Sequence, residues 1–154
     1  MVRQVAIVWC LFSSACVTLG KPDVEELKPA IESFHQKLRW KDFRVAADGI
    51  VPERRSSFIK ARTKSNDERD LFITDFQLED AVTNDDQSQA KAVSKLSWYR
   101  LPSTSEQTAT ITSVYVWRDR RWLLESQDDG PFPDLLGPPP LPPETAGAAA
   151  KKGR

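Results

Sequence analysis

The residue pattern changes from helical to extended at residues 71–78, which read LFITDFQL. Positions 72, 74, 76 and 78 alternate with Ile73, Asp75 and Gln77. A period of two places the first set on one face of a β-strand and the second set on the other face. The stretch therefore predicts the first strand of a sheet, beginning at Leu71.

Three later segments predict the other strands of this sheet. The turn residues 84–86 and 102–104 separate the first three strands, and residues 118–121 have the length of a tight hairpin turn but lack the usual Gly. Four consecutive strands joined by short turns predict an antiparallel meander. The inward positions are Ala92, Ser94, Leu96 and Trp98, then Ile111, Ser113, Tyr115 and Trp117, then Trp122, Leu123 and Leu124.

Upstream of residue 71 the apolar residues recur at helical spacing. Val24, Leu27, Ile31, Phe34 and Leu38 form one stripe at steps of three and four residues. Asp23 and Glu26 have the spacing of a capping box, and Pro29 predicts that the helix either kinks there or begins there. Shorter helices are predicted over 41–48, with Phe43, Ala46 and Ala47 inward, and over 52–62, with Phe58, Ile59 and Ala61 inward.

Helices followed by a meander favour an α+β fold, with N-terminal helices packed on one face of a curved four-stranded sheet. The globular composition spans residues 23–129, which is long enough for a single core. From Gly130 onward the composition changes, and seven of the eleven prolines follow this point. Residues 130–154 are therefore predicted to form a Pro/Ala-rich, disordered tail that serves as a spacer.

The N-terminus indicates export. Arg3 precedes the apolar run 5–12, and small residues then lead into Cys16. This arrangement resembles a bacterial lipoprotein signal, which implies a signal peptide over 1–15, lipidation of Cys16 and a tether over 16–22. The residue after Cys16 is Val rather than Asp, which in this resemblance points to the outer membrane, facing the periplasm. Ordinary cleavage that yields a soluble periplasmic or secreted protein, and an uncleaved anchor, remain as alternatives.

Charge and reactive residues exclude several kinds of function. The chain has 22 basic and 22 acidic residues, so it lacks the basic excess typical of nucleic-acid binding. Its two cysteines lie at positions 10 and 16, which leaves no thiol for a disulfide or for catalysis once Cys16 is lipidated. With a single histidine, no metal site and no cofactor are predicted.

Three motifs together resemble one fold family. Residues 34–43 read FHQKLRWKDF, residues 52–55 read PERR, and residues 114–125 read VYVWRDRRWLLE. Over about residues 23–127 the order of elements resembles the nuclear transport factor two-like superfamily. This cone-shaped, cystatin-like α+β fold is shared with ketosteroid isomerases and small polyketide cyclases. The resemblance implies a pocket between helices and sheet that takes a small apolar ligand, and homodimers that form through the sheet.

An isomerase or cyclase would need a carboxylate or imidazole in that pocket. The candidates are His35, Asp42 and Asp75. Each also has a structural interpretation: His35 as a helix-boundary residue, Asp42 as a helix cap, and Asp75 as part of a solvated sheet surface. Asp75 attracts attention because Ile73 is expected on the same strand face.

Four tryptophans are candidates for lining a ligand cavity or a partner surface: Trp40, Trp98, Trp117 and Trp122. Packing in the core or across the hairpin is the alternative role. The hairpin arginines at 118, 120 and 121 either contact anionic headgroups or form a solvated tip.

The sequence therefore favours a lipid-anchored, non-catalytic protein of the bacterial cell envelope that binds a partner protein or a small apolar ligand. The first alternative is an exported isomerase-like or cyclase-like enzyme that uses a pocket carboxylate. The second is an envelope assembly component that acts through the Pro-rich tail, for which truncation after Asp129 would leave folding intact.

Overall fold

The structure is a computed structural model and describes residues 22–137. The predicted signal peptide, Cys16 and the proline run that begins at Pro138 lie outside the described residues.

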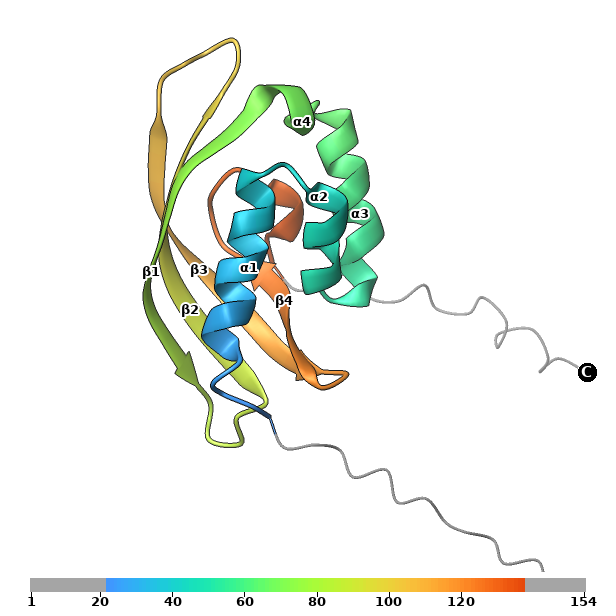
Figure 1. Ribbon diagram of the computed structural model, residues 1–154, viewed down its shortest axis with the longest axis vertical. Helices are drawn as coiled ribbons and strands as arrows, with labels where there is room; N and C mark the ends of the chain where they lie inside the picture. The colour runs from blue at the N-terminus through green and yellow to red at the C-terminus, as the bar shows by residue number, and fades with distance from the viewer. Residues whose placement is uncertain (1–21, 138–154) are drawn as a thin grey trace, which may run out of the picture.

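Helices come first and are followed by one antiparallel sheet, in the strand order β1-β2-β3-β4. Figure 1 shows the helices gathered on one face of the curved sheet, which confirms the predicted α+β fold. The short helix α4 was not predicted. The elements are α1 (Leu27–Arg39), α2 (Phe43–Ala46), η1 (Ala47–Gly49), α3 (Pro52–Lys64), α4 (Asp67–Asp70), β1 (Leu71–Thr83), β2 (Gln89–Arg100), β3 (Gln107–Arg118), β4 (Arg121–Gln127) and η2 (Pro133–Leu135).

A β-bulge in β1 changes which residues share a face. Ile73 pairs with Trp98, and Asp75 pairs with the next residue along β2, so Thr74 is an extra residue on β1. One extra residue reverses the alternation that follows it. The predicted common face of Ile73 and Asp75 is therefore wrong, because Ile73 is buried whereas Asp75 is exposed.

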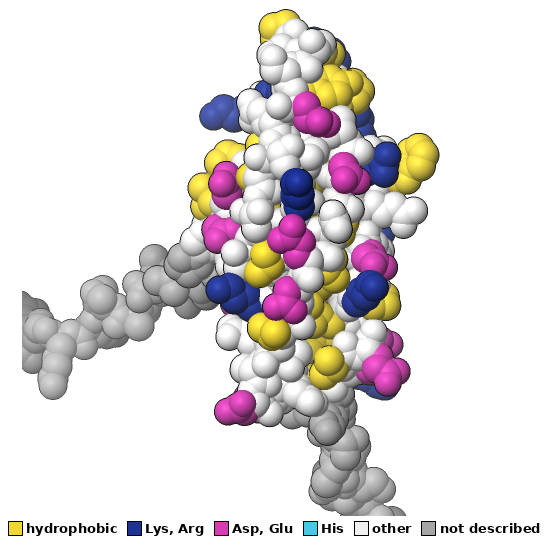
Figure 2. Space-filling model, turned by 90° about the vertical axis from the view of Figure 1, so that its left-hand side faces the viewer, with side chains coloured by type: hydrophobic (Ala, Val, Ile, Leu, Met, Phe, Trp, Pro, Cys, Tyr) yellow, Lys and Arg dark blue, Asp and Glu magenta, His cyan; other side chains and the backbone are white. Residues whose placement is uncertain are grey.

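Strand β2 follows the predicted alternation, and β3 follows it as far as Tyr115. Beyond Tyr115 the prediction is wrong, because Val116, which was expected on the outer face, is buried. Ala92, Ser94 and Leu96 of β2 are buried, as are Ile111 and Tyr115 of β3. The opposite face of the sheet carries threonine, lysine, aspartate and valine side chains, and Figure 2 shows this mixed surface. The core therefore lies between one face of the sheet and the helices.

Helix α1 begins at Leu27, so Pro29 lies in its first turn, where a missing N–H removes no intrahelical hydrogen bond. The predicted capping box is wrong. Glu26 is the N-cap without a side-chain cap bond, and the Asp23 carboxylate accepts a hydrogen bond from the Glu25 N–H at 2.9 Å. Val24 is exposed, so the buried stripe begins at Leu27.

The β3–β4 hairpin has the tight turn that its length predicts. Asp119 and Arg120 both adopt left-handed backbone angles, with φ of 52° and 62°. Two successive residues with positive φ are what a two-residue turn between twisted strands requires. The turn forms without Gly.

The described fold continues beyond Asp129, so the predicted start of the tail at residue 130 is wrong. Phe132 and Leu135 have no exposed surface, and Leu135 ends the short helix η2. Gly130 has a φ of 82°, and a Cβ there would lie 3.3 Å from the Ile111 side chain. This segment, residues 130–137, is called the C-terminal strap below. Its Gly and Pro residues suggested a tail, but its apolar residues enter the core.

Candidate functional site

Helix α3 buries two arginines. Arg54 and Arg62 are only 2% and 3% exposed, and the fully buried Phe58 lies between them on the same helical stripe. The sequence analysis missed both arginines, although their spacing of four residues on either side of Phe58 was a signal. Arginine is almost never fully buried without a partner. The contacts of these two side chains therefore show which parts of the fold they connect.

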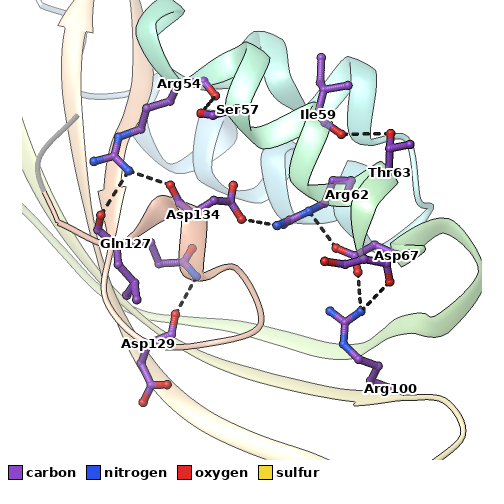
Figure 3. Close-up of polar contacts among 12 residues, drawn as sticks. Arg54, Ser57, Ile59, Arg62, Thr63, Asp67, Arg100, Gln127, Asp129 and Asp134 are labelled. Carbon is purple, nitrogen blue, oxygen red and sulfur yellow. Dashed lines mark hydrogen bonds and ion pairs between the residues drawn. The ribbon is translucent and has the colours of Figure 1, made fainter. Parts of the chain in front are cut away.

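Arg62 is the centre of a buried ionic network, drawn in Figure 3. Its Nε lies 2.8 Å from Oδ2 of Asp67, which has no exposed surface, and its Nη2 contacts the Asp134 carboxylate of the strap. Arg100 of β2 also pairs with Asp67. The Arg62 guanidinium lies over the rings of Phe58 and Phe132, 4.7 and 4.5 Å from their centroids. It therefore joins α3, the N-terminus of α4 and the strap.

Arg54 holds the strap through backbone carbonyls. Its Nη1 donates to the carbonyl oxygens of Asp134 at 3.0 Å and Leu136 at 3.4 Å, and its Nη2 donates to the carbonyl oxygen of Gly137.

Burial lowers the pKa of Arg62, and the carboxylates of Asp134 and Asp67 oppose this shift. The network thus balances desolvation against paired charge.

The strap fills space on the helix side of the sheet. Phe132 packs against Phe58, with ring centroids 6.0 Å apart, and Gly130 lies beside Ile111 and Leu96 of the sheet. The strap therefore occupies part of the space between helices and sheet, where the resemblance places a ligand pocket.

His35 is buried in an aromatic environment. It is 2% exposed, stacks on Phe76 with centroids 3.8 Å apart, and meets Phe34 edge-on at 5.3 Å. Burial lowers its pKa to about 3, so the imidazole is neutral near pH 7. Its Nδ1 atom has no hydrogen-bond partner among the described residues. The imidazole therefore behaves as a core ring rather than as part of a proton relay.

The two carboxylate candidates lie on the surface. Asp42 is exposed at the N-cap of α2, but its side chain forms no cap hydrogen bond. Asp75 is exposed, on the sheet face opposite the helices. One candidate is buried and two are exposed, so the three do not share a pocket in the described structure.

A shallow groove of about 180 Å³ lies between α1, η1 and the start of β4. Sites for drug-sized ligands usually measure about 300–1,000 Å³. The groove is therefore too small for a polycyclic ligand. It is lined by Glu26, Ala30, Ser33, Phe34, Lys37, Asp48, Gly49, Arg121, Trp122 and Leu123.

The four tryptophan candidates have different surroundings. Trp98 and Trp122 are buried, and Trp117 meets Trp122 across the hairpin with ring centroids 5.5 Å apart. Trp122 also lines the groove, and its Nε1 donates to the Asp23 carbonyl oxygen at 2.6 Å. Trp40 differs from the others because it is 71% exposed. It is the tryptophan that remains available to a partner.

Groups of metal ligands and membrane-spanning helices are both absent from residues 22–137. This part of the chain has no group of three or more His, Cys, Asp or Glu residues placed to hold a metal ion. Its helices also include none that is long and apolar enough to span a membrane.

Comparisons with known proteins give likeness of fold alone. No protein-family model and no curated protein sequence matches the chain. A SEC-C motif containing protein from Rhodopseudomonas palustris aligns with a TM-score of 0.56 and 16% identity, over 69% of this chain and 80% of that one. The intermembrane space region of the chloroplast protein ARC6 aligns with a TM-score of 0.51 and 11% identity, over 70% and 96%. This chain therefore shares an α+β fold with two remote structural neighbours.

Proposed function

We propose that this protein is a lipid-anchored, non-catalytic binding protein of the bacterial cell envelope. Its domain is of the nuclear transport factor two-like kind, Cys16 carries the lipid, and the outer membrane holds it facing the periplasm. Its ligand is a partner protein rather than a small apolar molecule. The resemblance of residues 1–16 to a lipoprotein signal supports the anchor.

The observation that carries the binding role is the filled helix side of the sheet. Phe132 and Leu135 of the strap occupy it, and Arg54 and Arg62 hold them in place. The neutral, stacked His35 and the exposed Asp42 and Asp75 offer no paired acid and base. The packed strap therefore favours binding at the surface of the domain over binding between the helices and the sheet.

Mass spectrometry of the native protein tests this proposal. The expected N-terminal peptide begins at Cys16 and carries acyl groups, and no small apolar ligand accompanies the protein. A Cys16→Ser variant should leave the membrane fraction, whereas Cys10→Ser should remain in it. A peptide that begins at Met1, membrane retention of Cys16→Ser, or a stoichiometric apolar ligand would overturn the proposal.

A further inference from the structure

The described chain enters the domain at one end of the sheet, and this distinguishes the two ends of the domain. The antiparallel order places the turns 84–88 and 119–120 at one end of the sheet and the turn 101–106 at the other. The chain enters the domain at the first end, where the Trp122 indole donates to the Asp23 carbonyl. This is called the anchor end. The C-terminus of α1 lies at the opposite, distal end (Figure 1).

The anchor end has an acidic excess, so it does not attract anionic lipid headgroups. Arg118 at this end is already paired with Glu53 at 2.7 Å. Besides this pair, the segments 23–28, 84–88 and 119–121 at this end contain six acidic residues and three basic residues. The acidic residues are Asp23, Glu25, Glu26, Asp85, Asp86 and Asp119, and the basic residues are Lys28, Arg120 and Arg121.

The distal end carries an exposed aromatic residue among basic residues. Residues 39–44 read RWKDFR, with three basic residues and one acidic residue. Trp40 is 71% exposed and Val45 is 48% exposed. The distal patch is defined here as Arg39, Trp40, Lys41, Asp42, Arg44 and Val45, so it carries three basic residues and one acidic residue.

Lys41 of the distal patch is fixed by contacts with its neighbours. Lys41 has a φ of 63°, and its Nζ lies 3.4 Å from the Phe72 ring centroid and donates to the Glu68 carbonyl at 2.8 Å. Phe72 in turn stacks on Tyr99, with centroids 4.8 Å apart. A surface that is already ordered loses little entropy on binding. Nothing in these contacts covers Trp40 itself.

We propose that the distal patch binds an acidic segment of a partner protein, with an apolar side chain of that segment packed on Trp40. The patch has a basic excess, so its complement is acidic, and Trp and Arg are the residues that dominate protein interfaces. This inference rests on the proposed function, because a Cys16 anchor leaves the distal end as the end farther from the membrane. Trp beside basic residues also occurs at membrane surfaces, which makes lipid the rival occupant to be tested.

Site-specific photocrosslinking in cells that naturally make the protein tests the partner. A benzophenone amino acid replaces Trp40 in one variant and Val82, which is 53% exposed on the outer sheet face, in the control variant. The expected adduct at position 40 joins a protein segment with more acidic than basic residues, identified by sequencing the crosslinked peptide. Arg44→Glu combined with crosslinking at position 40 should lower the yield about tenfold, because it removes the net positive charge of residues 39–45.

A synthetic peptide of the crosslinked segment then binds the purified domain, and Trp40→Ala should weaken that binding about 30-fold or more. A lipid adduct, an adduct to another copy of this chain, equal adducts at positions 40 and 82, or no adduct would overturn the inference. Fractionation of the same cells keeps the two proposals separate. If the protein is not retained in the membrane fraction but still crosslinks to an acidic segment, only the proposed anchor is wrong. If it is retained but gives no such crosslink, only the proposed docking site is wrong.

Discussion

Helices α1 and α3 both have 13 residues and both lie on the helix side of the sheet, but they attach to the domain by different means. Helix α1 buries the apolar residues Leu27, Ile31, Phe34 and Leu38 together with neutral His35. Helix α3 buries Phe58 between two charged arginines. The first attachment depends on area removed from water, and the second depends on partners at specific positions.

The difference between the two helices shows that the C-terminal strap is a structural part of the domain, because α3 depends on it for its polar partners. Arg62 finds one carboxylate on Asp67, close in sequence, and another on Asp134 of the strap. Arg54 finds its acceptors on the strap alone. Without the strap, α3 would hold two buried guanidinium groups with incomplete pairing, so the helix and the strap stabilise each other.

Truncation is expected to give the largest effect and to separate the two attachments most clearly. A chain that ends after Asp129 loses the buried Phe132 and Leu135, each worth about 2–5 kcal/mol. The sum approaches the whole free energy of unfolding of a small domain, so we expect an unfolded product. Circular dichroism and urea titration measure this. A chain that ends after Gly137 keeps every described contact and is the control. An unchanged urea midpoint after the shorter truncation would contradict the role of the strap.

The second test breaks the ionic attachment of α3. Arg62→Met should lower the free energy of unfolding by about 3–5 kcal/mol, because buried Asp67 and the Asp134 carboxylate both lose a charged partner. Adding Asp67→Leu should restore part of the loss, since Arg100 is 37% exposed at its side chain and water can solvate it. Urea unfolding of the two single variants and the double variant gives the coupling. Lys60→Met, on the exposed side of α3, is the control. Strictly additive losses would rule out the pair.

The third test uses pH on the apolar attachment of α1. The folded pKa of His35 is about 3, below the ordinary 6.5, so below pH 6.5 the unfolded chain takes up a proton that the folded chain does not. Stability from this group is complete above pH 6.5 and falls by about 1.4 kcal/mol per pH unit toward pH 3. His35→Leu should remove about 2–3 kcal/mol of the loss between pH 6.5 and 4.5.

Urea titrations of both proteins across this pH range provide the comparison. Gln36→Leu, on the exposed side of the same helix, should keep the original pH dependence. Parallel pH profiles for the original chain and His35→Leu would show that the imidazole is solvated rather than buried.

The smallest effect is expected from an ion pair on the surface. Arg118 and Glu53 lie 2.7 Å apart, but their side chains are 43% and 34% exposed. Such pairs are worth about 0.2–1 kcal/mol, so Arg118→Ala should change stability by less than about 1 kcal/mol, and high salt should reduce even this difference. Urea titrations at low and high salt measure it. A loss comparable to that of Arg62→Met would remove the contrast between buried and exposed pairs.

The fold was predictable because its signals are local. The stripe from Leu27 to Leu38 and the alternation in β2 and β3 each lie within one element, and both appear in the buried core. The bulge at Thr74 was not predictable, because one extra residue leaves no mark in the strand composition. That single residue places Asp75 on the outer face of the sheet, away from the helices where a pocket carboxylate was expected.

The candidate site was less predictable, because its contacts are distant in sequence. The contact between Arg62 and Asp134 spans 72 residues, and nothing near either position reveals the other. Prolines around Phe132 and Leu135 indicated a tail, although a short 3₁₀ turn also tolerates them. Trp40 was among the predicted binding residues, but its sequence neighbours could not show that it would be far more exposed than the buried Trp98 and Trp122.

The position of the strap also governs when the domain can close. A chain that leaves a ribosome or an export channel N-terminus first releases every helix of the bundle and every strand before it releases Phe132. The first carbonyl acceptor of the Arg54 guanidinium, that of Asp134, lies 80 residues further along the chain. Folding therefore finishes only when the last structured turn has emerged.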